Sequence, residues 1–169
     1  MRRLVTSAAA LAAVVVTAAA ASHHAALAHP DFSGTWVLDT ARTPASPYRP
    51  SSLTETDTQH GDTLRITRST TTPQGDVQST LTVGLDGKPW PNTVNGGAVQ
   101  ASMSTVATWA DSTLVLTSTI DIQGQEVHQV ERWTLSADHD TLTRVSDVDA
   151  MGQQLSLTLV LVRKGAAGM

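Results

Sequence analysis

The stretch Phe32-Ser33-Gly34-Thr35-Trp36-Val37-Leu38-Asp39 predicts how this chain folds. Its large apolar side chains Phe32, Trp36 and Leu38 fall at even-numbered positions and share one face with Gly34. A period of two is typical of a β-strand that buries one face and exposes the other. We therefore expect the folded part of the chain to begin with a strand over residues 32–39.

The same alternation continues downstream and predicts further antiparallel strands. β-branched Thr and Val are abundant, which suits a pleated surface, and turn residues recur every 10–14 residues or so. The expected strands after the first are residues 53–59, 63–71, 77–83, 99–109, 114–122, 127–135, 142–149 and 155–163. We expect residues 85–97 to form an irregular loop, because Pro89, Pro91 and several glycines interrupt the alternation.

The short connections favour a barrel over two packed sheets. Nearly every link is short enough for a hairpin, and consecutive hairpins form a meander whose closure removes its exposed edges. The expected fold class is all-β, a single antiparallel up-and-down barrel of about eight to ten strands with an apolar interior and a Thr/Ser-rich outer face. A β-sandwich is the alternative, although crossing between its sheets normally needs longer links.

Residues 1–28 have the layout of a secretory signal peptide. Arg2 and Arg3 precede an uncharged stretch, and Ala26-Leu27-Ala28 is a small-residue cleavage site. A membrane anchor is the alternative, since a span needs about 20 apolar residues. We expect cleavage after Ala28, a single domain over residues 29–169 with no stable membrane span, and a secreted or periplasmic location.

Composition excludes several classes of function. Without Arg2 and Arg3 the chain holds nine basic and fifteen acidic residues, a formal charge of −6, and no basic patch for nucleic acid. Cysteine is absent, so no disulfide can form. We expect no cofactor and no metal, because residues 29–169 contain no pair of histidines at ligand spacing. One remote alternative is copper on an N-terminal His29. The sequence does not predict an oligomeric state.

The chain resembles exported bacterial lipocalin-like domains of the calycin type. The likeness rests on residues 32–39, on Leu85-Asp86-Gly87-Lys88-Pro89 with Pro91-Asn92, on Trp109 before a turn, and on Glu131-Arg132-Trp133-Thr134-Leu135-Ser136. In lipocalins the Trp of the Gly-x-Trp segment closes one barrel end and a late basic residue packs over it. The resemblance places these roles at Trp36 and Arg163, and it implies a fold more than an activity.

The candidate site lies on the strand expected at residues 127–135. If Val127 and Leu135 point inward, then Gln129, Glu131 and Trp133 do so as well. A carboxylate inside a barrel must be paired or solvated, and Arg144 on the next strand could neutralise Glu131. The two interpretations are a wet ligand cavity and a structural ion pair at the barrel edge.

We expect the interior to bind a small, largely apolar molecule, oriented by a few polar groups. The candidate ligand-binding residues are Glu131, Gln129, Arg144, Trp133, Trp109, Met103 and Trp90, the last beside Lys88 in the loop expected at a barrel mouth. The alternatives are an enzyme that uses Glu131 as acid or base, and a structural or interaction module with a filled core. An open cavity favours the first two, and solid packing favours the third.

Overall fold

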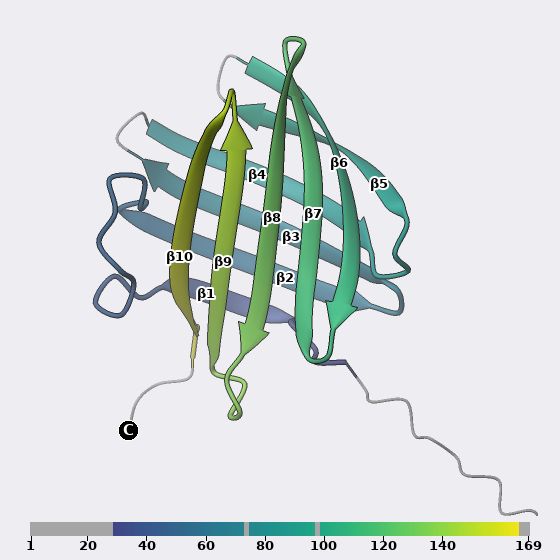
Figure 1. The fold of residues 1–169 in the computed structure, drawn as a ribbon. Helices are drawn as coiled ribbons and strands as arrows, with labels where there is room; N and C mark the ends of the chain where they lie inside the picture. Colours follow the sequence, from purple (N-terminus) through teal and green to yellow (C-terminus); the bar gives the residue numbers. More distant parts are fainter. Residues whose placement is uncertain (1–28, 73–74, 97–98, 166–169) are drawn as a thin grey trace, which may run out of the picture.

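The computed structural model describes residues 29–72, 75–96 and 99–165, so the expected signal peptide at residues 1–28 lies outside it. The described chain forms ten β-strands (Figure 1) and contains no helix able to cross a membrane. The strands are β1 (Gly34–Leu38), β2 (Ser52–His60), β3 (Thr63–Thr72), β4 (Gly75–Gly84), β5 (Pro89–Gly96), β6 (Val99–Ala110), β7 (Thr113–Ile122), β8 (Gln125–Leu135), β9 (Thr141–Ala150) and β10 (Gln153–Arg163).

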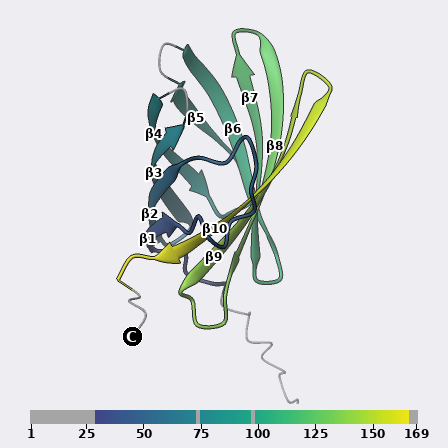
Figure 2. The same ribbon diagram turned by 90° about the vertical axis from the view of Figure 1, so that its left-hand side faces the viewer.

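These strands form one sheet that curls into a barrel. The order is β4-β3-β2-β1-β10-β9-β8-β7-β6-β5, with antiparallel ladders throughout. The wall formed by β7–β10 faces the wall formed by β1–β4 across the interior (Figures 1 and 2). The prediction of a single antiparallel up-and-down barrel is confirmed, and the sandwich alternative is wrong because β1 pairs with β10 and joins both walls into one sheet.

Two tight turns set the register of the wall that carries the candidate site. Gln123 and Gly124 link β7 to β8 with φ values of 56° and 84°, and Met151 and Gly152 link β9 to β10 with 52° and 75°. Positive φ at both central residues is the type I′ geometry, whose twist matches that of the flanking strands. These two-residue turns fix the register of β8 against β7 and of β10 against β9. Because a slip by one residue would reverse the faces, the fixed register determines which alternate residues of β8 and β9 point into the barrel.

The expected loop at residues 85–97 is wrong, because most of it is strand β5. Pro89 and Pro91 are tolerated there because β5 is an edge strand that pairs with β6 on one side only. The two prolines are separated by one residue, so both backbone nitrogens, which have no hydrogen to donate, face the side of β5 that has no partner strand. Trp90 therefore does not sit in a mouth loop. It packs against Gly84 of β4, where an added Cβ would lie 1.8 Å from the Trp90 Nε1 atom.

The seam between edge strands β4 and β5 is held by a side chain. Asn92 on β5 accepts a hydrogen bond from the backbone N–H of Thr82 through Oδ1 and donates one to the Thr82 carbonyl through Nδ2, both at 2.9 Å. The carboxamide thus takes the place of a paired peptide group at this point. Together with Trp90 over Gly84, it closes the barrel where the described strands have no backbone ladder.

Aromatic residues fill the end of the barrel where the chain enters β1. Trp36 is fully buried, and its indole N–H donates to the Phe32 carbonyl at 3.0 Å. The Arg163 guanidinium lies 4.3 Å from the centroid of the Trp36 ring and donates to the Ser33 carbonyl at 2.7 Å. Gly34 leaves space for this arginine, since a Cβ there would be 2.3 Å from Arg163 Nη1.

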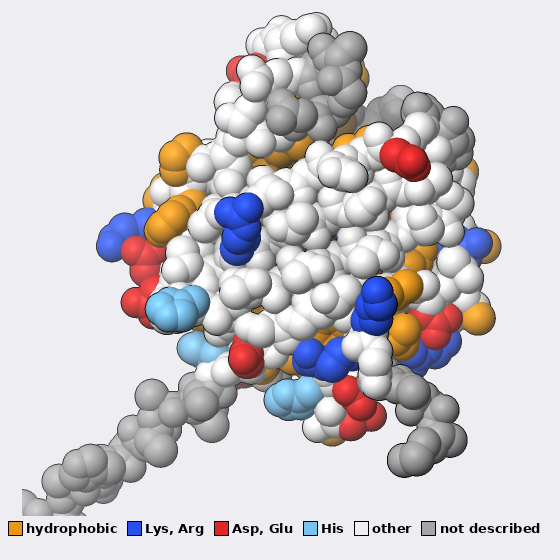
Figure 3. Space-filling model, turned by 180° about the vertical axis from the view of Figure 1, so that it is seen from behind, with side chains coloured by type: hydrophobic (Ala, Val, Ile, Leu, Met, Phe, Trp, Pro, Cys, Tyr) orange, Lys and Arg blue, Asp and Glu red, His pale blue; other side chains and the backbone are white. Residues whose placement is uncertain are grey.

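The outer face of the wall seen in Figure 3 carries few charges. Viewed from behind, the strands present mostly uncharged polar side chains, with scattered charges near the turns (Figure 3). Threonine pairs such as Thr67 and Thr80, with hydroxyls 3.5 Å apart, lie on this face. The hydroxyl-bearing outer wall and apolar core follow the alternation that the sequence predicts.

Replacing Asn92 by leucine removes both seam hydrogen bonds while keeping the side chain similar in size. We expect the free energy of unfolding to fall by about 1–3 kcal/mol, because the Thr82 peptide group loses both partners. Urea unfolding followed by tryptophan fluorescence measures the loss, and amide hydrogen exchange at Thr82 should become faster. The control Thr93→Val, at the neighbouring exposed position, should change stability by less than about 0.5 kcal/mol. Unchanged exchange at Thr82 in Asn92→Leu would contradict the role of this side chain.

Candidate functional site

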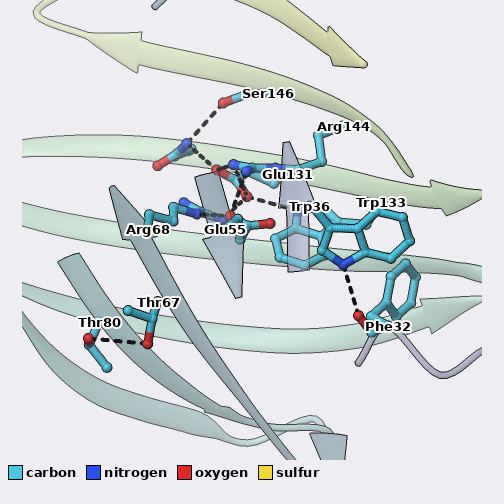
Figure 4. A network of polar contacts seen from close by, with 11 residues as sticks. Phe32, Trp36, Glu55, Thr67, Arg68, Thr80, Glu131, Trp133, Arg144 and Ser146 are labelled. Carbon is cyan, nitrogen blue, oxygen red and sulfur yellow. Dashed lines mark hydrogen bonds and ion pairs between the residues drawn. The ribbon is translucent and has the colours of Figure 1, made fainter. Parts of the chain in front are cut away.

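Four strands place five ionisable side chains inside the barrel. Strand alternation puts Glu55 and Asp57 of β2 on the same inner face as Leu53, and it puts Arg68 of β3 on the face of Leu64 and Ile66. In the opposite wall, β8 and β9 contribute Glu131 and Arg144. Figure 4 shows Glu55, Arg68, Glu131 and Arg144 converging between the two walls.

These four residues, Glu55, Arg68, Glu131 and Arg144, form a four-charge ring in which each arginine contacts both carboxylates. Arg144 donates to Glu55 at 2.7 Å and to the two oxygens of Glu131 at 3.1 and 3.2 Å. Arg68 donates to Glu131 at 3.1 Å and also binds Glu55 through Nε. Two positive and two negative charges therefore alternate and compensate one another.

Neutral side chains complete the coordination of the ring. Trp133 lies at its buried side, with its indole N–H donating to Glu131 at 2.8 Å and its ring centroid 4.9 Å from the guanidinium carbon of Arg144. Gln129 donates through Nε2 to Glu131 and to the Ser146 hydroxyl, both at 2.9 Å. The carboxylate of Glu131 thus receives hydrogen bonds from four different side chains.

The ring holds Glu131 in its ionised form. Burial alone would raise the pKa of Glu131, but Arg144, Arg68 and the hydrogen bond from Trp133 outweigh burial and lower the pKa to about 2. The same carboxylates raise the pKa of Arg68 above its ordinary value, against the opposing effect of burial. A carboxylate with a pKa near 2 is a weak base and has no proton to donate at neutral pH, so Glu131 is poorly suited to acid/base catalysis.

Asp57 behaves in the opposite way. It is 2% exposed, and burial together with the negative charge of Glu55 raises the pKa of Asp57 to about 9. No donor among the described residues reaches its oxygens, and a hydrogen bond to Glu55, which needs the protonated carboxyl as donor, also raises the pKa of Asp57. Asp57 is therefore protonated at neutral pH, and the buried cluster as a whole carries no net charge.

The barrel interior is open above the ring and nearly filled beside it. A cavity of about 340 Å³, here called the cup, opens at the end of the barrel where the β1–β2 loop lies. The cup is lined by Tyr48, Pro50, Leu53, Arg68, Thr70, Thr72, Val77, Ser79, Gln129, Glu131, Arg144, Ser146, Leu157 and Leu159. A second space of about 20 Å³ lies against Arg68, Gln129 and Glu131, enough for one water molecule.

The structure brings together only some of the residues that the sequence suggested for ligand binding. Glu131, Gln129 and Arg144 line the cup, and Met103 borders the small space next to it. Trp133 is fully buried beneath the ring and lines neither space.

The other two tryptophans of that set lie away from the cup. Trp109 is at the closed end, where it stacks on His29 with ring centroids 4.1 Å apart and approaches Phe32 at 6.0 Å. Trp90 is at the seam between β4 and β5, at the end of the barrel opposite the cup. It therefore does not lie in the loop that the sequence suggested at a barrel mouth.

Sequence reasoning missed half of the ring and its protonated neighbour. Glu55 and Asp57 follow Leu53 at intervals of two, and Arg68 follows Ile66 in the same way, so alternation alone assigns all three to the inner face. This signal was available in the sequence. The sequence does not show which of these residues pair across the barrel, because the pairing depends on how the closed sheet brings β2 and β3 opposite β8 and β9.

Comparisons with solved structures found several similar chains. The chain is similar to a solved structure of secretory abundant heat soluble protein 4 from Ramazzottius varieornatus, with 12% identity and a TM-score of 0.51, over 78% of this chain and 94% of that one. It is also similar to zebrafish ileal bile acid-binding protein complexed with cholic acid, with 16% identity and a TM-score of 0.45, over 78% and 98% of the two chains. At these identities the likeness concerns the fold alone. No model of a protein family matches the chain, and no curated protein matches it.

Replacing Asp57 by asparagine should stabilise the protein at alkaline pH. The pKa of Asp57 is raised from 3.8 to about 9, so its contribution to the free energy of unfolding is complete below about pH 4 and declines as the pH rises toward 9. Asparagine mimics the protonated acid at every pH. We expect Asp57→Asn to exceed the wild type by at least about 1 kcal/mol at pH 8 and to differ much less at pH 5.

Urea unfolding at the two pH values measures this difference, with Asp149→Asn as a control at an exposed aspartate. A loss of stability in Asp57→Asn at both pH values would show instead that the arginines need Asp57 as an anion.

The contribution of Glu131 to stability has the opposite pH dependence. The pKa of Glu131 is lowered from 4.5 to about 2, so its contribution is present above about pH 4.5 and is lost as the pH falls toward 2.

Proposed function

We propose that this protein is an exported β-barrel that binds a small, largely apolar molecule in the cup. The observation that carries the proposal is a cavity of about 340 Å³ with an uncharged wall above a polar floor. Ligand sites in proteins typically occupy about 300–1,000 Å³ and combine apolar walls with a few placed polar groups. The cup has both properties, and its volume favours a small ligand.

The wall provides the apolar surface for binding. Leu53, Leu157 and Leu159 line the cup together with Val77 and Pro50, and none of the remaining wall residues is charged. Apolar area removed from water stabilises a complex by about 25 cal/mol per Å². The ligand's apolar body would therefore lie along these side chains, with its polar end toward Gln129 and the ring.

The mouth of the cup is already organised by the loop between β1 and β2. The Thr43 hydroxyl accepts a hydrogen bond from the Val160 N–H at 3.0 Å and lies 3.3 Å from the Val160 carbonyl. Arg49 donates to the carbonyls of Thr40 and Thr43 at 3.1 and 3.0 Å. Tyr48, which is 63% exposed, projects from this fixed loop at the rim of the cup. A preformed site loses less entropy on binding.

The two other functions considered from the sequence receive less support. Glu131 is unsuited to acid/base catalysis at neutral pH because its pKa is about 2. A filled core describes the aromatic end of the barrel around Trp36 and Trp133, but it does not describe the cup. Export, to the periplasm or out of the cell, is part of the proposal and rests on the leader at residues 1–28.

Native mass spectrometry of the protein purified from its own host tests this proposal directly. We expect a population with added mass that disappears on denaturation and releases a small molecule of low polarity. A protein that carries no added mass, and that also binds no apolar probe in solution, would contradict ligand binding in the cup.

Replacing Leu157 by tryptophan should fill part of the cup and abolish binding of the neutral apolar probe N-phenyl-1-naphthylamine. Leu157 lines the cavity, so the larger side chain occupies ligand volume. The matched control is Thr158→Trp, which adds the same ring at the next residue of β10, on the outer face. Fluorescence titration should give at least about tenfold weaker binding for Leu157→Trp and near-wild-type binding for Thr158→Trp. Equal binding by both variants would place the probe elsewhere.

A further inference from the structure

We propose that the polar end of the ligand is an uncharged hydroxyl or carbonyl group, and that the four-charge ring at the floor of the cup selects against carboxylates. This inference rests on the proposed function, because it assigns the chemistry of the molecule that the cup would hold. It follows from the charge balance of the floor and from the hydrogen-bonding groups that the ring leaves free.

The two arginines of the floor are already neutralised. Arg68 and Arg144 each contact both Glu55 and Glu131, so the floor carries no net positive charge to attract a ligand's anion. The rest of the cup lining contains no other charged residue. A carboxylate that entered would add a third negative charge to a neutral, largely buried cluster, and an uncompensated charge in such a place is costly.

The protein itself contains a carboxyl group that shows this effect. Asp57 lies in the same cluster, next to Glu55, and it is neutral at pH 7 although both arginines attract its anion. Burial and the carboxylates already present outweigh that attraction. A ligand carboxyl group at the floor of the cup would meet Arg68, Arg144 and Glu131, with the buried carboxylate of Glu55 bound to both arginines behind them.

Neutral polar groups, in contrast, find partners at the floor. Among the described residues, Gln129 uses its Nε2 for Glu131 and Ser146, and its Oε1 accepts no hydrogen bond. The Ser146 hydroxyl accepts from Gln129 and keeps its own proton for another acceptor. Arg68 Nη1 makes no hydrogen bond to the described chain. One acceptor and two donors suit a ligand hydroxyl, which both donates and accepts, or a carbonyl, which accepts.

Competition between 1-decanol and decanoate at pH 8 tests the inference, because the two molecules share a chain length and differ in the charge of the head group. Each displaces N-phenyl-1-naphthylamine from the wild-type protein, and fluorescence gives both dissociation constants. We expect 1-decanol to bind at least about tenfold more tightly than decanoate. Equal or tighter binding of decanoate would overturn the inference and leave ligand binding in the cup intact. Failure of the probe and of both competitors would overturn the proposed function, and this inference with it.

Decanoate loses more hydration than 1-decanol in any apolar site, so a preference for 1-decanol does not by itself identify the ring as the cause. The decisive measurement is therefore the change in the ratio of the two dissociation constants when one carboxylate of the ring is removed. Glu131→Gln gives the floor an excess positive charge with little change in shape. We expect the preference for 1-decanol over decanoate to fall at least about tenfold. The matched control Glu126→Gln, at an exposed position of the same strand, should keep the wild-type ratio.

A second variant covers the case in which Glu131→Gln does not fold, as judged by circular dichroism. Thr70→Lys places a new cation on the wall of the cup and leaves the ring untouched, and Ser69→Lys places the same charge at the neighbouring exposed position. Thr70→Lys should shift the ratio toward decanoate, and Ser69→Lys should not. A ratio that stays at the wild-type value in every folded cup variant would overturn the inference.

Discussion

The contacts of two arginines with two carboxylates, Arg68 and Arg144 with Glu55 and Glu131, constrain how the two walls of the barrel lie against each other. Each corner of the ring comes from a different strand, β2, β3, β8 or β9, and these strands belong to opposite walls. Buried charges are tolerated only when each is paired and hydrogen-bonded. The relative placement of the two walls is therefore fixed by polar geometry as well as by apolar packing, which is less directional.

The ring also divides the interior into two parts with different chemistry. On one side Trp133, Trp36 and Phe32 pack without lining a cavity, and the arginine guanidiniums lie against the Trp133 ring. On the other side the walls separate into the cup. A ligand in the cup would rest on charged groups that are neutral as a set, so the floor is polar without carrying a field of one sign.

Much of the fold could be predicted from the sequence, because period-two alternation and frequent turns describe an antiparallel meander directly. The same alternation identified Glu131 and Gln129 as inward-facing, and Arg144 as a neighbour on the next strand. It could not pair Glu131 with Arg68, which lies 63 residues away and meets it only through closure of the barrel. Strand β5 was not predicted because Pro89 and Pro91 normally argue against a strand. An edge strand accepts them, since one of its sides has no partner strand.

The native state binds one more proton at neutral pH than the unfolded chain does, at the carboxyl group of Asp57. An unfolded chain at neutral pH would carry this carboxyl group as an anion, whereas the folded barrel keeps it neutral with a pKa of about 9. Folding therefore takes up hydrogen ion from the solvent, and unfolding returns it. Heats of unfolding measured calorimetrically near pH 7 would consequently include the ionisation enthalpy of whichever buffer accepts that proton, so the apparent enthalpy would differ between phosphate and Tris.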